Sequence, residues 1–311
     1  MSRREIGMAI GLTLSDPRLV VTEARQAEAA GFDLVAVGEH VFHHGGAPNP
    51  YVQLAAAAAA TTRIRLLSSV SLLPLYPAAL AAKLAATLDL VSGGRFDLGV
   101  GAGGEYEAEF AAVGVDPVTR FRKLDESLDV LQRLFTGERV SYDGEYTVLD
   151  DVALDPPPVQ DGGPPIWLGG RGDGALRRAG RFAQVWMPYM VTPDRLAEGL
   201  VTARRQAEEV GRDPASIRGA LFAFVCVDDD AVWARQTGTA TVSRTYQQDF
   251  APLAAQYLLL GSSDDVCSRI AEFTGAGAET IVLQVAATGP VDRRRVMQTL
   301  ISEVLPKVAA S

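Results

Sequence analysis

The sequence predicts a closed parallel barrel of eight strands and eight helices, the (β/α)8 or TIM-barrel class. Two observations lead to this prediction. Apolar segments of strand length alternate with segments of helical periodicity along the chain, and the composition shifts nowhere, so one domain is expected over residues 1–311. The strand segments are continuous apolar runs, as strands covered by helices require. The same alternation of strands and helices also fits an open doubly wound sheet, which is the alternative fold.

Each element follows from a local pattern. The expected strands cover residues 5–14, 32–38, 63–73, 95–100, 166–169, 183–188, 217–227 and 280–286. The expected helices cover residues 16–30, 51–61, 77–91, 117–135, 172–182, 193–211, 264–275 and 291–308. Gly31 ends the first helix in the C-cap position, Pro77 begins the third helix, and Ser92-Gly93-Gly94 stops it.

Two segments break the alternation and are expected to be insertions within the barrel, near residues 142–165 and 230–260. In the first, Asp143-Gly144 is a hairpin turn signal, and residues 155–165 (DPPPVQDGGPP) form a stiff excursion. The second segment is expected to be mostly helical.

The amino-acid composition limits the kinds of partner that the protein is expected to bind. A net charge of −9 argues against a nucleic-acid or anionic-membrane surface. Three lysines stand against 26 arginines, so an anion is expected on arginine, backbone N–H groups or helix N-termini. Cys226 and Cys267 lack metal-ligand spacing and are expected to be free thiols of a cytoplasmic protein. The N-terminal residues predict neither export nor a membrane span.

All three histidines of the chain, His40, His43 and His44, follow the second strand, at the end where a barrel carries its chemistry. Histidine exchanges protons near neutral pH, so proton transfer or substrate binding is expected there. His40 is favoured because it follows the strand most directly. Surface loop histidines are the alternative, and no neighbouring carboxylate or cysteine spacing supports a metal site.

The fourth strand runs into a loop of small residues, Gly101, Ala102, Gly103 and Gly104, and then into Glu105. Such a loop lets a flat or phosphorylated ligand approach the backbone, and Glu105 stands where a carboxylate can transfer protons. An ordinary strand-to-helix turn is the alternative.

Two further strand ends are unusual. Ser68 and Ser69 interrupt an apolar strand just before Val70, which indicates either tight packing or a bulge that presents backbone to a ligand. Gly169-Gly170 ends the fifth strand and opens a helix, where a phosphate would rest on the helix N-terminus with Arg171 as its partner.

Several stretches resemble the bacterial luciferase-like flavin monooxygenase superfamily. They are AEAAGFDLVAVGEH, RIRLLSSVSLLPLYPAALAAKLAATLDLVSGGRFDLGVGAGG, FRKLDESLDVLQRLFTG, DPPPVQDGGPPIWLGG and LLLGSSDDVCSRIAEFTGAGAETIVLQ. The resemblance covers nearly the whole chain. It implies a TIM barrel that holds FMN or the deazaflavin coenzyme F420 at its C-terminal mouth, and a homodimer.

Within the superfamily the chain is most similar to the F420-dependent oxidoreductases. This similarity implies a non-proline cis peptide between Ser69 and Val70, in a bulge against the deazaflavin ring. An acidic residue, a histidine and a glutamate of the F420-dependent sugar-phosphate dehydrogenases map to Glu39, His40 and Glu105, with Gly103 contributing backbone. The lysines that clamp a sugar phosphate in those enzymes have no counterpart here, and His43 or His44 takes the place of a tryptophan.

Together, these expectations predict an enzyme that transfers a hydride between F420 and a small organic substrate. His40 and Glu105 would act as acid and base, in either order. The cofactor would be held by Glu39, Ser69, Val70, Gly101, Ala102, Gly103, Gly169, Gly170 and Arg171, and the substrate by His43 and His44. Two alternatives stay open: an FMN-dependent monooxygenase that uses O2 with a separate reductase, and a non-catalytic flavin-binding protein on the same fold.

Overall fold

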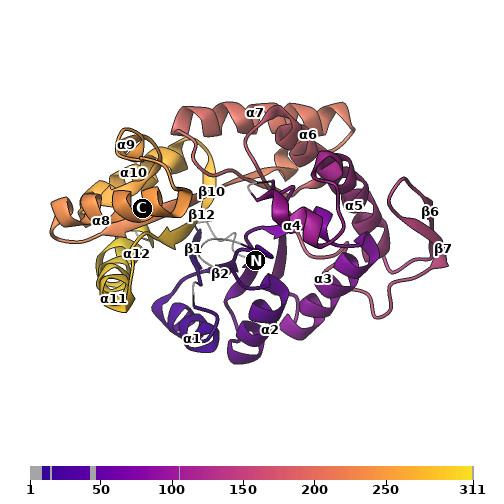
Figure 1. Cartoon of the computed structure of the whole chain (residues 1–311), viewed down its shortest axis with the longest axis horizontal. Coiled ribbons are helices and arrows are strands. Elements are labelled where there is room, and N and C mark those ends of the chain that lie inside the picture. The colour runs from indigo at the N-terminus through magenta and orange to yellow at the C-terminus, as the bar shows by residue number, and fades with distance from the viewer. Residues whose placement is uncertain (1–8, 15, 43–46, 105, 310–311) are drawn as a thin grey trace, which may run out of the picture.

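Eight parallel strands close into a barrel in a computed structural model that describes residues 9–14, 16–42, 47–104 and 106–309 (Figure 1). The barrel strands are β1 (Ala9–Thr13), β2 (Leu34–Val37), β3 (Arg65–Ser68) with its continuation β4 (Ser71–Leu72), β5 (Phe96–Gly101), β8 (Ile166–Gly169), β9 (Val185–Met187), β10 (Arg218–Val227) and β12 (Ala278–Val285). Each pairs in parallel with the next, and β12 pairs with β1. The circuit is therefore closed, which confirms the barrel and excludes the open sheet.

The strands are apolar on both faces because each face packs on a different layer. In β2, Leu34 and Ala36 belong to a cluster inside the barrel, whereas Val35 and Val37 belong to the larger core under the helices. We call the inner cluster the lumen cluster; its buried members are Leu34, Ala36, Leu67, Trp167, Val185, Met187, Ala220 and Val282. Continuous apolar runs therefore follow directly from this alternation.

Helices surround the barrel in the order that the sequence predicts. Their bounds are α1 (Val20–Ala30), α2 (Pro50–Ala60), α3 (Ala78–Ser92), α5 (Arg120–Phe135), α6 (Asp173–Phe182), α7 (Pro193–Glu209), α10 (Ser263–Gly275) and α11 (Pro290–Thr299). A π-helical turn, Leu300–Val304, joins α11 to α12 (Leu305–Ala309). Gly31 and Gly93 end α1 and α3 in the left-handed conformation, as expected of C-cap glycines.

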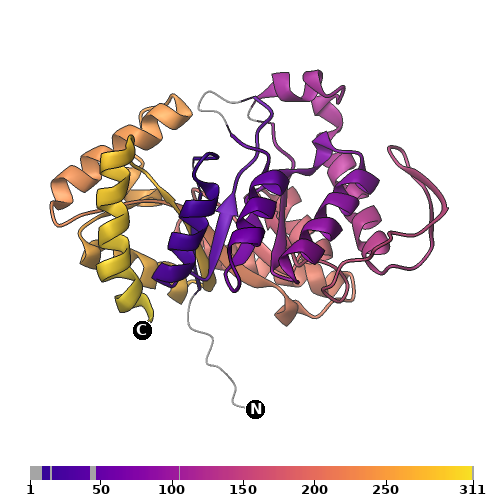
Figure 2. The same cartoon turned by 90° about the horizontal axis from the view of Figure 1, so that it is seen from below.

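Additional elements occupy the two irregular segments and one mouth loop. An antiparallel hairpin, β6 (Val140–Asp143) and β7 (Val148–Val152), turns after Asp143 and projects from the side of the barrel (Figure 1). The later segment contains α8 (Ala231–Tyr246), α9 (Ala254–Tyr257) and the short strand β11 (Leu259–Gly261), which pairs with β10. Helix α4 (Glu107–Ala112), which the sequence did not predict, rises above the same end of the barrel as α8 (Figure 2).

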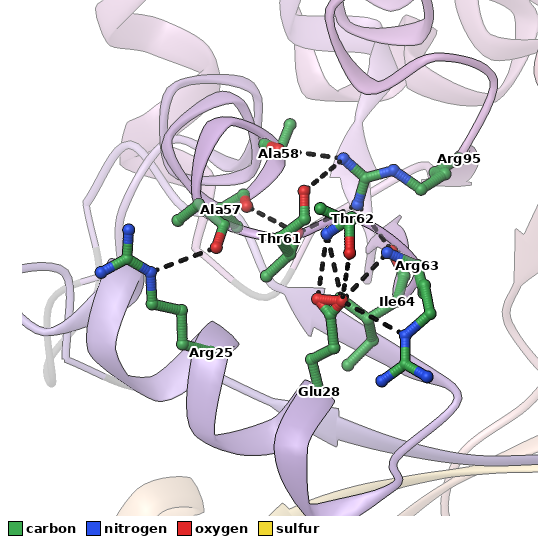
Figure 3. Close-up of polar contacts among 10 residues, drawn as sticks. Arg25, Glu28, Ala57, Ala58, Thr61, Thr62, Arg63, Ile64 and Arg95 are labelled. Atoms are coloured by element: carbon green, nitrogen blue, oxygen red, sulfur yellow. Dashed lines mark hydrogen bonds and ion pairs between the residues drawn. The ribbon is translucent and has the colours of Figure 1, made fainter.

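The opposite, N-terminal end is fixed by polar contacts to the loop between α2 and β3 (Figure 3). Arg95 donates hydrogen bonds to the carbonyls of Ala58, Thr61 and Ile64 at 2.9, 3.2 and 2.9 Å. The Glu28 carboxylate accepts the N–H groups of Thr62 and Arg63 at 3.0 Å each. These contacts lie at the strand starts, so they tie the barrel together away from its mouth.

Candidate active site

The end of β2 carries an acid–histidine pair. His40 follows the strand, and its Nδ1 lies 2.9 Å from Oε1 of Glu109, a fully buried carboxylate on α4. The other oxygen of Glu109 accepts the N–H groups of Val41 and Phe42 at 2.6 and 3.3 Å. Glu109 therefore fixes both the imidazole and the backbone that follows it.

Glu109 is the carboxylate that sequence reasoning missed. The sequence favours Glu105 because it comes first after the glycine loop. Glu105 lies outside the described residues, as do His43 and His44. The missed signal is the pair Glu109-Phe110: Phe110 is fully buried against Leu72 and Leu75, so the helix that carries it also buries its neighbour. A six-residue helix is too short for its periodicity to stand out in a sequence.

Glu39 is buried beside this pair, and its two carboxylate oxygens face the protein. One oxygen accepts from Asn49 Nδ2 at 3.0 Å and from the Tyr76 hydroxyl. The other accepts from Ser71 Oγ at 3.0 Å and from Leu72 N at 2.7 Å. Burial, the largest effect, raises the pKa of Glu39 above its usual range although these bonds oppose it, and the Glu109 carboxylate adds to the increase.

The serine-rich segment between β3 and β4 is a bulge. Leu67 pairs with Asp97 of β5, but Ser71 pairs with Val100. This strand therefore contains one residue more than its partner over the same length. The Ser69–Val70 peptide bond in the bulge is cis, as the resemblance implied. Ser68 holds the adjoining register, because its hydroxyl contacts both N and O of Gly99 at 2.9 Å.

Glycines make room for the bulge. A Cβ on Gly101 would lie 2.7 Å from Val70 Cγ2, and a Cβ on Gly169 would lie 3.3 Å from Val70 Cγ1. Val70 itself packs against the lumen cluster. The side chain of Val70 thus forms a shelf above the barrel interior, bordered on both sides by bare backbone, and a flat ring can approach such a surface closely.

Buried polar atoms without partners occur around this shelf. Among the described residues, Thr13 Oγ1, Ser69 Oγ and Trp167 Nε1 are buried and make no hydrogen bond. Thr13 ends β1 between Leu12 and Leu14, which pack outward, so its side chain faces the lumen. Unpaired buried polar groups are costly and call for a partner. A planar ligand with polar edge atoms, such as a flavin or deazaflavin, fits this set.

The predicted glycine loops have backbone conformations that favour glycine. Gly103, Gly104 and Gly170 have φ of 65°, 119° and 101°, and Ala102 is half-buried between them and the strand. Arg171 is exposed; its Nη1 donates to the Met190 carbonyl at 3.0 Å, and its guanidinium lies 5.4 Å from the Tyr189 ring centre.

Two further observations concern metal binding and membrane crossing. No group of three or more histidine, cysteine, aspartate or glutamate side chains suited to a metal ion occurs in the described part of the chain. Over the same residues, no helix combines the length and apolar character that crossing a bilayer needs.

The bulge over the lumen and the buried acid–histidine pair lie at the C-terminal mouth of a parallel barrel, which is the end where barrel enzymes carry their chemistry. A sequence model of the luciferase-like monooxygenase family matches residues 5–280. The chain therefore belongs to that family.

The proteins that it resembles in sequence or in fold include both deazaflavin and flavin proteins. It is 26% identical over 333 residues to the F420-dependent glucose-6-phosphate dehydrogenase of Gordonia bronchialis, covering 98% of this chain and 97% of that protein. An F420-dependent secondary alcohol dehydrogenase in complex with an F420–acetone adduct matches with a TM-score of 0.82, 22% identity and coverage of 96% and 99%. The oxygenating constituent of 3,6-diketocamphane monooxygenase from Pseudomonas putida, in complex with FMN, matches with a TM-score of 0.75, 22% identity and coverage of 97% and 98%.

Proposed function

We propose that the protein is an F420-dependent oxidoreductase that transfers a hydride between the deazaflavin and a small organic substrate. The observation that carries the proposal is the His40–Glu109 pair, set 2.9 Å apart beside a bulge whose surroundings fit a flat ring. The full-length similarity to an F420-dependent dehydrogenase supports F420 over FMN.

The residues would divide the work as follows. Val70, Gly101 and Gly169 would bear the ring, and the orphan hydroxyls of Thr13 and Ser69 would meet its polar edge. When bound, F420 supplies or accepts the hydride. Glu39 would act by holding the strand after the bulge, since both its oxygens bond to protein groups. Backbone of Gly170, in the loop that leads from β8 to α6, would receive the cofactor phosphate near the N-terminus of that helix.

His40 would manage the proton that accompanies the hydride. Glu109 holds Nδ1, which orients the ring so that Nε2 exchanges the proton with the substrate oxygen. The Glu109 charge stabilises the imidazolium formed when a substrate hydroxyl loses its proton. Glu105 stays a further candidate for this role, and His43 and His44 stay candidates for substrate contact.

The test is equilibrium binding of the purified apoprotein to F420 and, separately, to FMN, followed by turnover of a panel of alcohols and ketones. Tight binding of F420 with loss of hydride transfer of about 100-fold or more in Glu109→Gln, at unchanged F420 affinity, supports the proposal. Preference for FMN with O2 consumption would instead indicate the monooxygenase. Cofactor binding with full activity in Glu109→Gln would remove the acid–histidine pair from the mechanism.

A further inference from the structure

A pocket of about 530 Å³ opens at the mouth on the side of the barrel formed by β8 and β9. Its walls come from segments far apart in sequence: Tyr106 before α4, Arg171 after β8, Tyr189 after β9, Tyr246 at the end of α8, Phe250 in the following loop, and Tyr257 of α9. The volume lies within the range of roughly 300–1,000 Å³ that is common for small-molecule sites.

The lining of this pocket is aromatic with a single charge. Five of the side chains just named carry aromatic rings, and the other lining residues are neutral. Arg171 is the only charged side chain among the described residues that line the pocket. Planar aromatic groups stack on such rings, and a guanidinium pairs with a carboxylate, sulfonate or phosphate.

The aromatic wall is joined to the barrel interior, so its shape is fixed. Phe222, which packs against the lumen cluster, contacts Phe224 edge to face with ring centres 5.6 Å apart. Phe224 contacts Tyr246 at 6.0 Å, and Tyr246 contacts Phe250 at 5.5 Å. This series of rings runs from the lumen to the pocket wall, and rigid aromatic walls select ligands by shape at low entropic cost.

Arg171 is held in place on the pocket side. It donates to the Met190 carbonyl at 3.0 Å and lies over Tyr189. Met190 and Tyr189 both line the pocket. A guanidinium has five N–H donors, and the bond to Met190 uses one nitrogen, so the group retains donors for a ligand anion.

We infer that this pocket binds the substrate, and that the substrate is a planar aromatic or conjugated molecule with one anionic group, which pairs with Arg171. This changes the predicted role of the Arg171 side chain from the cofactor phosphate to the substrate. The assignment of the bound molecule as the substrate rests on the proposed function, but the rest of the inference does not. The chemistry of the pocket can be measured without any cofactor.

The probe is 2-naphthoate, with two matched comparisons: its uncharged amide, and the saturated decahydro-2-naphthoate. Calorimetric titration of the apoprotein is expected to show that 2-naphthoate binds about tenfold more tightly than the amide, which lacks the charge-assisted pair, and about tenfold more tightly than the saturated acid, which lacks ring stacking. Arg171→Met should reduce 2-naphthoate affinity to that of the amide and leave amide binding unchanged. Arg177→Met, on the exposed surface of α6, should change neither and serves as the control.

A second variant guards against misfolding of the first. Leu253→Trp fills the pocket from its lining and should abolish binding of all three ligands, while thermal unfolding verifies the fold. Equal affinities of the three ligands, or 2-naphthoate binding that Arg171→Met leaves unchanged, would overturn the pocket chemistry.

Titration in the presence of a cofactor distinguishes a pocket for an anionic substrate from a pocket for the cofactor's own phosphate. If the pocket holds substrate, saturating F420 or FMN leaves 2-naphthoate bound. Displacement of 2-naphthoate by either cofactor would assign the pocket to the cofactor and reject the inference. If neither cofactor binds, the proposed function fails while the naphthoate series still decides what the pocket recognises.

Discussion

At the scale of single residues, the mouth contains two carboxylates with different surroundings. Glu109 accepts from His40 and two backbone N–H groups, whereas Glu39 accepts from two side-chain hydroxyls, an amide and one N–H group. Burial raises the pKa of Glu39, and it also raises the pKa of Tyr76, whose hydroxyl faces the Glu39 charge. Glu39 is therefore placed to hold structure, and its ionisation carries a cost.

This cost predicts a pH dependence of stability. Because the folded-state pKa of Glu39 is raised, the folded protein keeps this proton at pH values where the unfolded chain has lost it. The free energy of unfolding of the wild type should therefore fall relative to Glu39→Gln as pH rises from about 4.5, the usual Glu value, through the raised pKa. Urea unfolding at several pH values between about 4 and 8 measures the difference.

The control for this comparison is Glu107→Gln, on the exposed side of α4. A pH dependence that appears alike in both variants would not be specific to Glu39. Parallel curves for Glu39→Gln and the wild type would show that Glu39 titrates alike in the folded and unfolded states, against the expectation.

Residue-level prediction from the sequence was partial for a physical reason. His40 and the serines before Val70 stand out in the sequence because they directly follow or interrupt apolar strands, and such interruptions are visible without the fold. Glu109 was missed because a carboxylate becomes notable only through burial and its partners, which depend on the fold. The four bonds to Glu39 likewise come from segments up to 37 residues away.

At the scale of elements, the bulge and the ends of β5 and β8 form one unit. Val70 lies between Gly101 and Gly169, and its side chain is closer to Gly101 than to Gly169. An added methyl at Gly101 would approach Val70 to 2.7 Å, well inside contact distance, whereas one at Gly169 would approach to 3.3 Å. The two glycines therefore offer a graded test of the shelf.

Gly101→Ala should destabilise the protein by about 1–3 kcal/mol, the usual range for overpacking, and Gly169→Ala by less. Both should weaken cofactor binding in the same order if the shelf bears the ring. Denaturant unfolding and cofactor titration measure the two effects. In a Val70→Ala background, which removes the clashing methyl groups, the cost of Gly101→Ala should largely disappear. A cost that persists there would place its cause elsewhere.

At the scale of the whole molecule, the two ends of the barrel are separated by task. The N-terminal end is held by Arg95 and Glu28, and the mouth carries the acid–histidine pair, the bulge and the aromatic pocket. The strand alternation that predicts the barrel also predicts this division. The α4 helix and the Arg95 contacts are not predictable in that way, because they depend on loops meeting in space.

Arg95→Met should therefore lower stability without changing the mouth. The loss of bonds to four carbonyls, that of Ser92 included, is expected to cost about 2–4 kcal/mol, since each would be left without its charged partner. Cofactor affinity of the folded variant should equal that of the wild type. Arg63→Met, whose side chain is 79% exposed, should change stability by less than about 0.5 kcal/mol. Reduced cofactor affinity in Arg95→Met would show that the two ends are coupled.

The extra residue in the β3–β4 segment has a consequence for how this strand alternates. Before the bulge an odd-numbered residue, Leu67, belongs to the lumen cluster; after it an even-numbered residue, Val70, packs against the same cluster. The bulge thus acts as a frame shift in the inward–outward parity of the strand. Deleting one residue there, such as Ser69, would leave Val70 two positions after Leu67 and still facing inward, but in a regular strand without the bulge. The extra residue is therefore accommodated within the bulge, and the residues after it keep the register that a regular strand one residue shorter would give them.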